Sequence, residues 1–180
     1  KGMDARFIRA FTDPAQVNIL GYVVYPFCLK YRVRLLAIGS PFVTPGEFGA
    51  AQMLAAIKVC AEQPIDEVTG KDKALLIRWE READLLLKTA ADFRTYMLEE
   101  HWPKFWETQS QNQKASGMPW VLNIIANLVA NGIDERRAWD MPEAQAIWMS
   151  TAFSGLKGVD VNLLTTEDEE AMDAFTPSQG

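Results

Sequence analysis

Residues 73–101, KALLIRWEREADLLLKTAADFRTYMLEEH, carry the longest helical pattern in the 180-residue chain. Apolar side chains recur in this stretch at alternating spacings of three and four residues, which places them along one face of an α-helix. The pattern predicts a single long helix, and we expect this helix to be the spine of the fold. Its apolar positions are Leu76, Trp79, Ala83, Leu86, Ala90, Phe93 and Met97.

Local signals predict shorter helices on both sides of this spine. In TPGE, residues 44–47, Thr44 has the position of an N-cap and Pro45 that of a first helical residue, so a helix should run from Pro45 to about Ala61. The stretch TGKD at 69–72 is interpreted as a solvated loop. Further helices are predicted near residues 4–12, 27–38, 119–131, 141–153 and 166–175.

The stretch AWDMPEAQAIWM at residues 138–149 contains another helix start. Asp140 can accept a backbone N–H as an N-cap, and Pro142 suits the first turn, whose N–H groups have no partner within the helix. Glu143 is favoured near the positive end of the helix dipole. We therefore expect a helix that begins at this point and buries Trp148.

Together these signals predict a mainly α protein. The expected fold is a single-domain helical bundle of about five to seven helices, with a minor extended segment or small hairpin near residues 17–25. Residues 1–165 should form the helical globular domain, and residues 166–180 an acidic C-terminal tail with a short helix. The acidic character of this end is clear, because residues 154–180 carry six Asp/Glu against one Lys.

Composition narrows the function classes. With a net charge of −6 the chain lacks a global basic footprint, so nucleic-acid binding would depend on the local cluster Lys30, Arg32 and Arg34 and is not expected. The longest apolar run, residues 120–130, is far shorter than the roughly 20 residues that span a bilayer. Two isolated cysteines, Cys28 and Cys60, fit buried thiols in a reducing compartment. We expect a cytoplasmic protein without a membrane anchor.

No catalytic or metal-binding motif is recognisable. His101 is the single histidine, and a histidine that closes a long helix commonly complements the negative end of the helix dipole. The remaining candidates for an enzyme are Cys28, Glu99 and Glu100, which have no motif spacing. The chain also has no cysteine pair, HExxH sequence or glycine-rich phosphate loop. We therefore predict a protein that is not an enzyme, with no catalytic residues, metal or cofactor.

Two groups of side chains are candidates for binding a partner. The aromatic cluster between residues 102 and 120 can form either core or interface, because tryptophan is costly to expose and is enriched at binding hot spots. Asn123, Asn127 and Asn131 form a polar line along the helix at 119–131, most simply a solvent-facing side. The predicted contact residues are Trp102, Phe105, Trp106 and Asn123, with Asp168, Glu169 and Glu170 as a charged tail.

Three stretches resemble one family of proteins. The stretches are AWDMPEA followed by IWM at residues 138–149, YPF followed by LLAIGSPF at residues 25–42, and the acidic EDEE at residues 167–170. They resemble tail assembly chaperones of bacteriophages and prophages. The resemblance implies a viral protein in the host cytoplasm, without enzymatic activity, that binds a tail tape-measure or tube protein until assembly. The alternative is a small phage or bacterial regulator that inhibits a host protein by surface binding, with a helical enzyme as a third class. No oligomeric state follows from the sequence.

Overall fold

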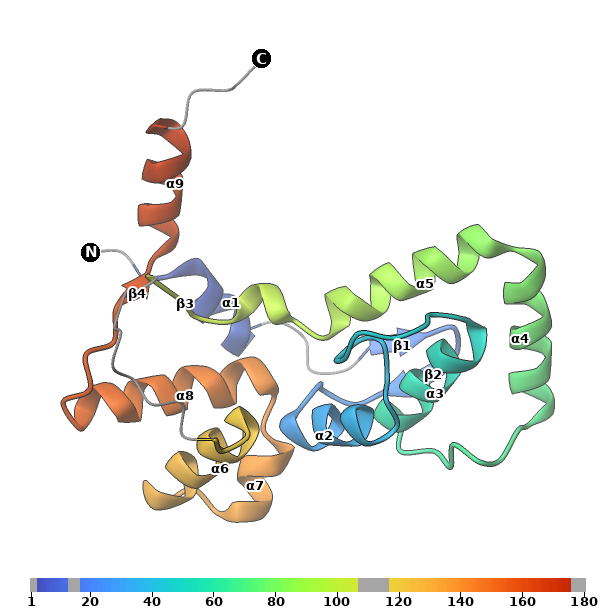
Figure 1. Ribbon diagram of the computed structural model, residues 1–180, viewed down its shortest axis with the longest axis horizontal. Helices are drawn as coiled ribbons and strands as arrows, with labels where there is room; N and C mark the ends of the chain where they lie inside the picture. Colours follow the sequence, from blue (N-terminus) through green and yellow to red (C-terminus); the bar gives the residue numbers. More distant parts are fainter. Residues whose placement is uncertain (1–2, 13–16, 107–116, 176–180) are drawn as a thin grey trace. The chain divides into compact units, whose positions relative to one another are not determined.

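The computed structural model describes residues 3–12, 17–106 and 117–175. Within these ranges it contains nine α-helices, one 3₁₀ turn and two small antiparallel sheets of two strands each (Figure 1). The prediction of a mainly α protein with a small hairpin is confirmed. Over the same ranges, no helix combines the length and the apolar character that are needed to cross a membrane.

The chain divides into two compact units. Unit 1 comprises Lys1–Asp13, Glu100–Trp139 and Glu143–Gly180, and unit 2 comprises Pro14–Glu99 and Asp140–Pro142. The sequence predicts one domain at residues 1–165 and a tail at residues 166–180. That assignment stays a prediction.

Unit 2 begins with the hairpin that was predicted near residues 17–25. Strands β1 (Val17–Ile19) and β2 (Tyr22–Val24) pair antiparallel, with Ile19 opposite Tyr22. Gly21 adopts a φ of +81°, a conformation that glycine tolerates and that a tight hairpin turn requires. The hairpin is attached to the helices of the unit, because the Tyr25 N–H donates to the Cys60 carbonyl at 3.0 Å.

Four helices complete unit 2: α2 (Leu29–Ala37), α3 (Ala50–Cys60), α4 (Gly70–Arg81) and α5 (Ala83–Tyr96). The prediction that a helix begins at Pro45 is wrong, since α3 begins at Ala50 after Gly49 as N-cap. Thr44 closes a turn instead. Its backbone N–H and its hydroxyl both donate to the Ser40 carbonyl, at 3.1 and 3.2 Å.

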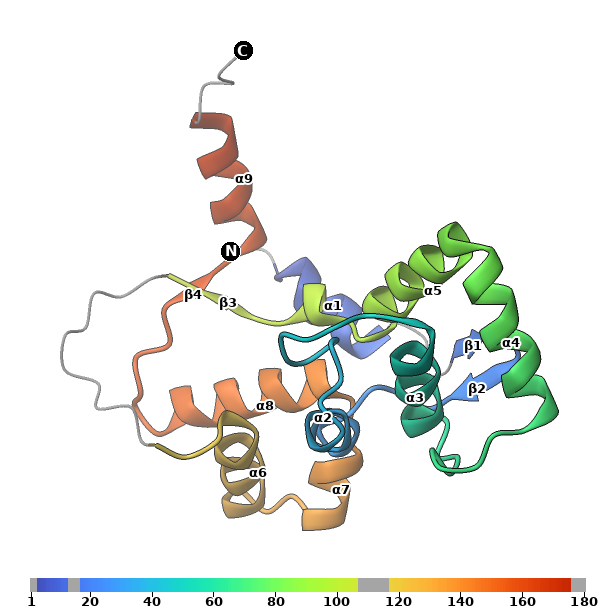
Figure 2. The ribbon, with the colours of Figure 1, turned by 45° about the vertical axis from the view of Figure 1, so that its right-hand side comes forward.

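The predicted spine helix is two helices. Glu82, with φ −122° and ψ 76°, ends α4 and precedes α5, and Figures 1 and 2 show the two helices meeting at an angle. In a straight helix, Trp79 and Phe93 would be about 21 Å apart along the axis. Both are buried in one core cluster, at 1% and 0% exposure, which the break makes possible.

The stretch at 69–72, predicted as a solvated loop, is a helix cap in which Thr69, Gly70 and Lys71 are exposed and Asp72 is buried. The Asp72 backbone N–H donates to Thr69 Oγ1 at 3.2 Å, and the Thr69 backbone N–H donates to Asp72 Oδ2 at 2.8 Å. This reciprocal pair is a capping box that satisfies two N–H groups at the start of α4. The prediction is wrong because the Thr-x-x-Asp spacing at this position is itself a cap signal.

Unit 1 is built around the packing of α8 (Glu143–Leu156) against α6 (Trp120–Ala130) and α1 (Ala5–Thr12). Between α6 and α8 lies α7 (Glu135–Asp140), and the remaining elements are β3 (Lys104–Phe105), β4 (Leu163–Leu164) and α9 (Thr166–Phe175). The 3₁₀ turn η1 (Glu99–His101) spans the boundary between the two units. Trp148 is buried in α8, as predicted.

The predicted helix start at Asp140 differs from the structure, which has a separate short helix at this point. Asp140 is the last residue of α7, and its carboxylate accepts a hydrogen bond from Lys30 Nζ at 2.7 Å. The cap of α7 lies before it, where the Arg137 N–H donates to Asp134 Oδ1 at 3.1 Å. Because α7 uses residues 135–140, α8 begins at Glu143, two residues after the predicted start.

Candidate protein-interaction site

A short strand pair brings Phe105 and Trp106 to the base of α9. Lys104 lies opposite Leu164 and Phe105 opposite Leu163, and the Trp106 N–H extends the ladder by donating to the Asn162 carbonyl at 2.9 Å. The Phe105 and Trp106 side chains remain 47% and 42% exposed. Figure 2 shows α9 following closely after β4, so the backbone of Phe105 and Trp106 is paired with the segment that leads into the acidic helix.

Asp168, a predicted contact residue, caps α9. Its Oδ2 accepts hydrogen bonds from the Thr165 N–H at 3.0 Å and from the Thr165 hydroxyl at 2.7 Å. In return, the Asp168 N–H donates to Thr165 Oγ1 at 3.2 Å. Asp168 therefore has a structural role in beginning the helix.

Glu169, another predicted contact, is held by two cations. Its carboxylate lies 2.6 Å from Lys104 Nζ and 3.2 Å from Arg6 Nη1. Arg6 is only 6% exposed, forms an ion pair with Asp4 at 2.8 Å, and donates to the Leu164 carbonyl. The hydrogen bond to Asp4 raises the pKa of Arg6. Glu169 thereby fixes α9 to α1 and β3.

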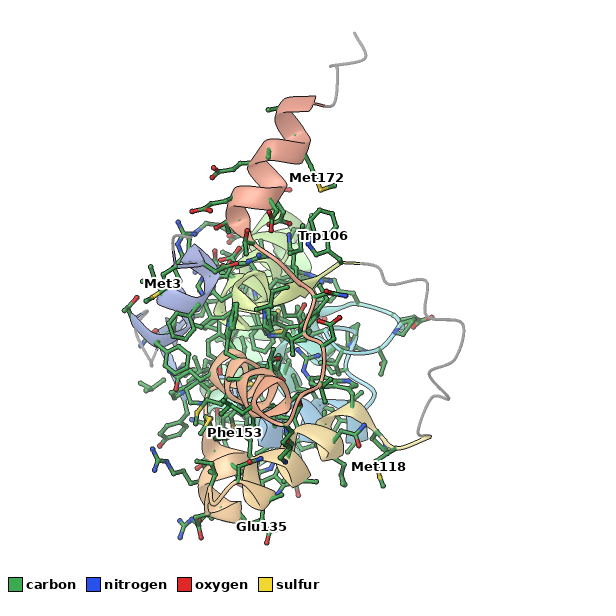
Figure 3. All side chains as sticks on the ribbon, turned by 90° about the vertical axis from the view of Figure 1, so that its left-hand side faces the viewer. Met3, Trp106, Met118, Glu135, Phe153 and Met172 are labelled. Carbon is green, nitrogen blue, oxygen red and sulfur yellow. The ribbon has the colours of Figure 1, made fainter. Side chains whose placement is uncertain are left out.

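The third predicted acidic residue, Glu170, lies in a shallow groove of about 470 Å³ along α9. Its neighbours in the groove include Asp173, one turn further on, and the apolar side chains of Leu164 and Met172. Within residues 3–12, 17–106 and 117–175, neither Glu170 nor Asp173 forms an ion pair. In the view of Figure 3, Met172 and Trp106 extend on the same side of α9.

The other predicted aromatic contact, Trp102, is half-buried. It packs against the small core formed by Ala10, Ala144 and Trp148, and its ring centroid lies 5.8 Å from that of Trp120. The structure therefore divides the predicted aromatic cluster. Trp102 belongs to the packing of unit 1, whereas Phe105, Trp106 and Trp120 present surface.

The asparagine line on α6 faces solvent only in part. Asn127 Nδ2 donates to the Ser150 carbonyl at 2.8 Å, and Asn131 Nδ2 donates to the Asn127 carbonyl at 2.6 Å. Asn123 is exposed. The prediction is wrong for Asn127 because α8 supplies the polar partners that this amide needs when it is partly buried.

The residues of the enzyme alternative are divided between the two units. Cys28 is buried in unit 2, where burial raises the pKa of its thiol, and Glu99 of the same unit forms an ion pair with Arg32 at 2.5 Å. In unit 1, His101 is 3% exposed and its Nε2 lies 3.6 Å from Glu100 Oε1. No group of three or more potential metal ligands occurs among the described side chains.

The basic cluster at residues 30–34 is used within unit 2. Lys30 Nζ lies 2.9 Å from Glu62 and 2.7 Å from Asp140. Arg32 is occupied by Glu99. The charge that could attract a nucleic acid is thus largely compensated, whereas Arg34 remains exposed.

Several groove residues were not predicted as contacts: Lys104, Leu164, Met172 and Asp173. Their grouping depends on the pairing of β3 with β4, for which the sequence carries no local signal. Comparison of the chain with protein-family models, with curated proteins and with solved structures gives no match.

Proposed function

We propose that this chain is a non-enzymatic protein-binding protein and that its contact surface is the base of α9, termed here the α9 surface. The surface consists of Trp106, Glu170, Met172 and Asp173, and Phe105 of β3 lies next to Trp106. The observation that supports this proposal is the exposure of two adjacent aromatic side chains, 47% and 42%, on backbone that β4 holds in place. Such aromatic side chains on a rigid support are typical of binding hot spots.

The class of partner follows from the resemblance to tail assembly chaperones. On this proposal the α9 surface covers apolar segments of a tape-measure or tube protein in the host cytoplasm until assembly. Exposed apolar side chains supply the contact area, and the acidic charge of the chain keeps the complex soluble. The same chemistry would suit inhibition of a host protein, so the identity of the partner decides between the two.

The test is affinity capture of the tagged chain from phage-infected or induced cells, followed by mass spectrometry. Three chains are compared: the wild type, the double variant Phe105→Ala/Trp106→Ala, and a control double variant, Val68→Ala/Leu87→Ala. Both control residues are exposed, at 51% and 61%, and lie in unit 2.

Recovery of a tail component with the wild type and the control, but not with Phe105→Ala/Trp106→Ala, supports the proposal. Recovery of a host enzyme or regulator in the same pattern overturns the chaperone class and supports the inhibitor. Equal recovery with all three chains overturns the α9 surface, and absence of a specific protein from the wild-type eluate overturns protein binding itself.

A further inference from the structure

We infer that the groove along α9 binds a basic amphipathic segment of the partner protein, in which two cationic side chains flank an aliphatic one. This inference rests on the proposed function for its choice of a protein as the ligand. It adds the chemistry of the segment and assigns a role to each side of the groove.

The charge of the groove selects a cationic ligand. Lys104 lies at its edge, and the ion pair with Glu169 neutralises this ammonium. Two carboxylates then remain on the groove, those of Glu170 and Asp173, and neither has a partner among the residues described here. Lysine or arginine side chains would complement both.

The spacing of these carboxylates restricts the ligand further. Glu170 and Asp173 are three residues apart on α9, so they lie on the same side of the helix, with Cβ atoms about 5–6 Å apart. A helical ligand can match them with cations one turn apart, and an aliphatic side chain can then lie on the same side of that helix.

The apolar lining of the groove indicates that the ligand carries an aliphatic side chain as well as cations. Leu164 comes from β4 and Met172 from α9, and Met172 is 49% exposed. An aliphatic side chain that packs between them would remove apolar surface from water on both sides. Methionine suits such a contact because its flexible thioether adapts to different shapes. The volume of about 470 Å³ is sufficient for a few side chains.

The test measures fluorescence anisotropy of labelled synthetic peptides with the full chain. The probe peptide is an amphipathic helix in which lysines spaced three or four residues apart lie on the same side as leucine. One reference peptide replaces every leucine by serine, and a second replaces every lysine by glutamate. We expect the wild type to bind the lysine–leucine peptide about tenfold more tightly than either reference, and more weakly as salt is added.

Two double variants distinguish the effect of the groove carboxylates on binding from the effect of the net charge of the chain. Glu170→Lys/Asp173→Lys reverses the groove, whereas Glu80→Lys/Asp84→Lys makes the same change of charge at exposed positions of unit 2. We expect the first variant to lose about tenfold or more in affinity and the second to stay within about twofold. A third variant, Met172→Ser, should reduce the preference for leucine over serine. Circular dichroism checks that each variant is folded.

Three outcomes overturn the inference: equal losses in the two double variants, equal affinity for the leucine and serine peptides, or no peptide binding by the wild type. Failure of the inference is distinguishable from failure of the proposed function. If capture recovers the partner with Glu170→Lys/Asp173→Lys as well as with the wild type, only the groove assignment fails.

Discussion

Lys58 Nζ lies 3.0 Å from Asp72 Oδ2, and the two side chains are 3% and 1% exposed. Asp72 also accepts a hydrogen bond from the Tyr22 hydroxyl and caps α4, while Lys58 donates to the Glu67 carbonyl. One buried carboxylate thus joins the hairpin, α3 and the start of α4.

Replacing Asp72 by alanine should destabilise unit 2 by about 3–5 kcal/mol, because it leaves the Lys58 ammonium buried without its counter-charge. Urea unfolding monitored by tryptophan fluorescence measures the change. Arg78→Ala is the control, since its ion pair with Glu82 is more than half exposed and should contribute less than about 1 kcal/mol. The double variant Lys58→Met/Asp72→Leu should recover part of the loss, because it removes the unpaired ammonium but still leaves the Tyr22 hydroxyl and the Thr69 N–H without their acceptor. A double variant as unstable as Asp72→Ala would contradict this account.

The Asp72 carboxylate should also make the free energy of unfolding depend on pH. Burial opposes ionisation of Asp72, but hydrogen bonds from Tyr22, the Thr69 N–H and Lys58 outweigh it and hold the pKa of Asp72 well below its usual range. A lowered pKa in the folded state stabilises the protein above the unfolded-state pKa of about 3.9, and this stabilisation is lost as the pH falls toward the folded value. The free energy of unfolding should therefore decrease between about pH 5 and pH 2, and less steeply in Asp72→Asn.

The sequence predicts those elements of the fold that neighbouring residues specify, and it does not predict those that depend on contacts between distant residues. The bounds of α9 and the hairpin with Gly21 follow from local residues and are confirmed. Local residues do not predict the break at Glu82, because glutamate favours helix. The cause of the break is the core cluster that Trp79 and Phe93 share.

The candidate site was less predictable than the fold. Phe105 and Trp106 stand out as aromatic residues in a polar region, but their position beside α9 depends on β4, which is 58 residues away according to the pairing of Phe105 with Leu163. Glu169 and Glu170 look alike in sequence. The positions of Lys104 and Arg6 show that Glu169 is used internally, whereas Glu170 is available to a ligand.

The two cysteines should resist alkylation in the native protein. Cys60 is fully buried, which raises the pKa of its thiol to about 12, and burial also raises the pKa of Cys28. Because the thiolate is the reactive form, iodoacetamide at neutral pH should label both far more slowly than in urea. Mass spectrometry over time measures the rates. Labelling of either cysteine as fast as in the unfolded chain would show that its site is open to solvent.

The cap at Thr165 and Asp168 predicts different effects for neighbouring acidic residues of α9. Asp168→Ala should destabilise the helix by about 1 kcal/mol, since it removes the acceptor for the Thr165 N–H and hydroxyl. Hydrogen exchange of the α9 amides measures this locally. Glu170→Ala is the control and should leave exchange almost unchanged, because Glu170 is exposed. If both variants accelerate exchange equally, Asp168 has no special role as a cap.

Asn127 should be the asparagine of α6 on which stability depends. Its amide donates to the Ser150 carbonyl at 2.8 Å and to Ser154 Oγ at 3.1 Å, so Asn127→Ala removes polar contacts between α6 and α8. The expected cost is about 1–3 kcal/mol, because partly buried acceptors lose their donor. Thermal unfolding of the variant measures it. Val129→Ala, a truncation at a 41% exposed position of the same helix, should cost less than about 1 kcal/mol. A larger loss for Val129→Ala than for Asn127→Ala would mean that the outer side of α6 is covered in solution, whereas the expected order identifies the Asn127 side as the one that packs.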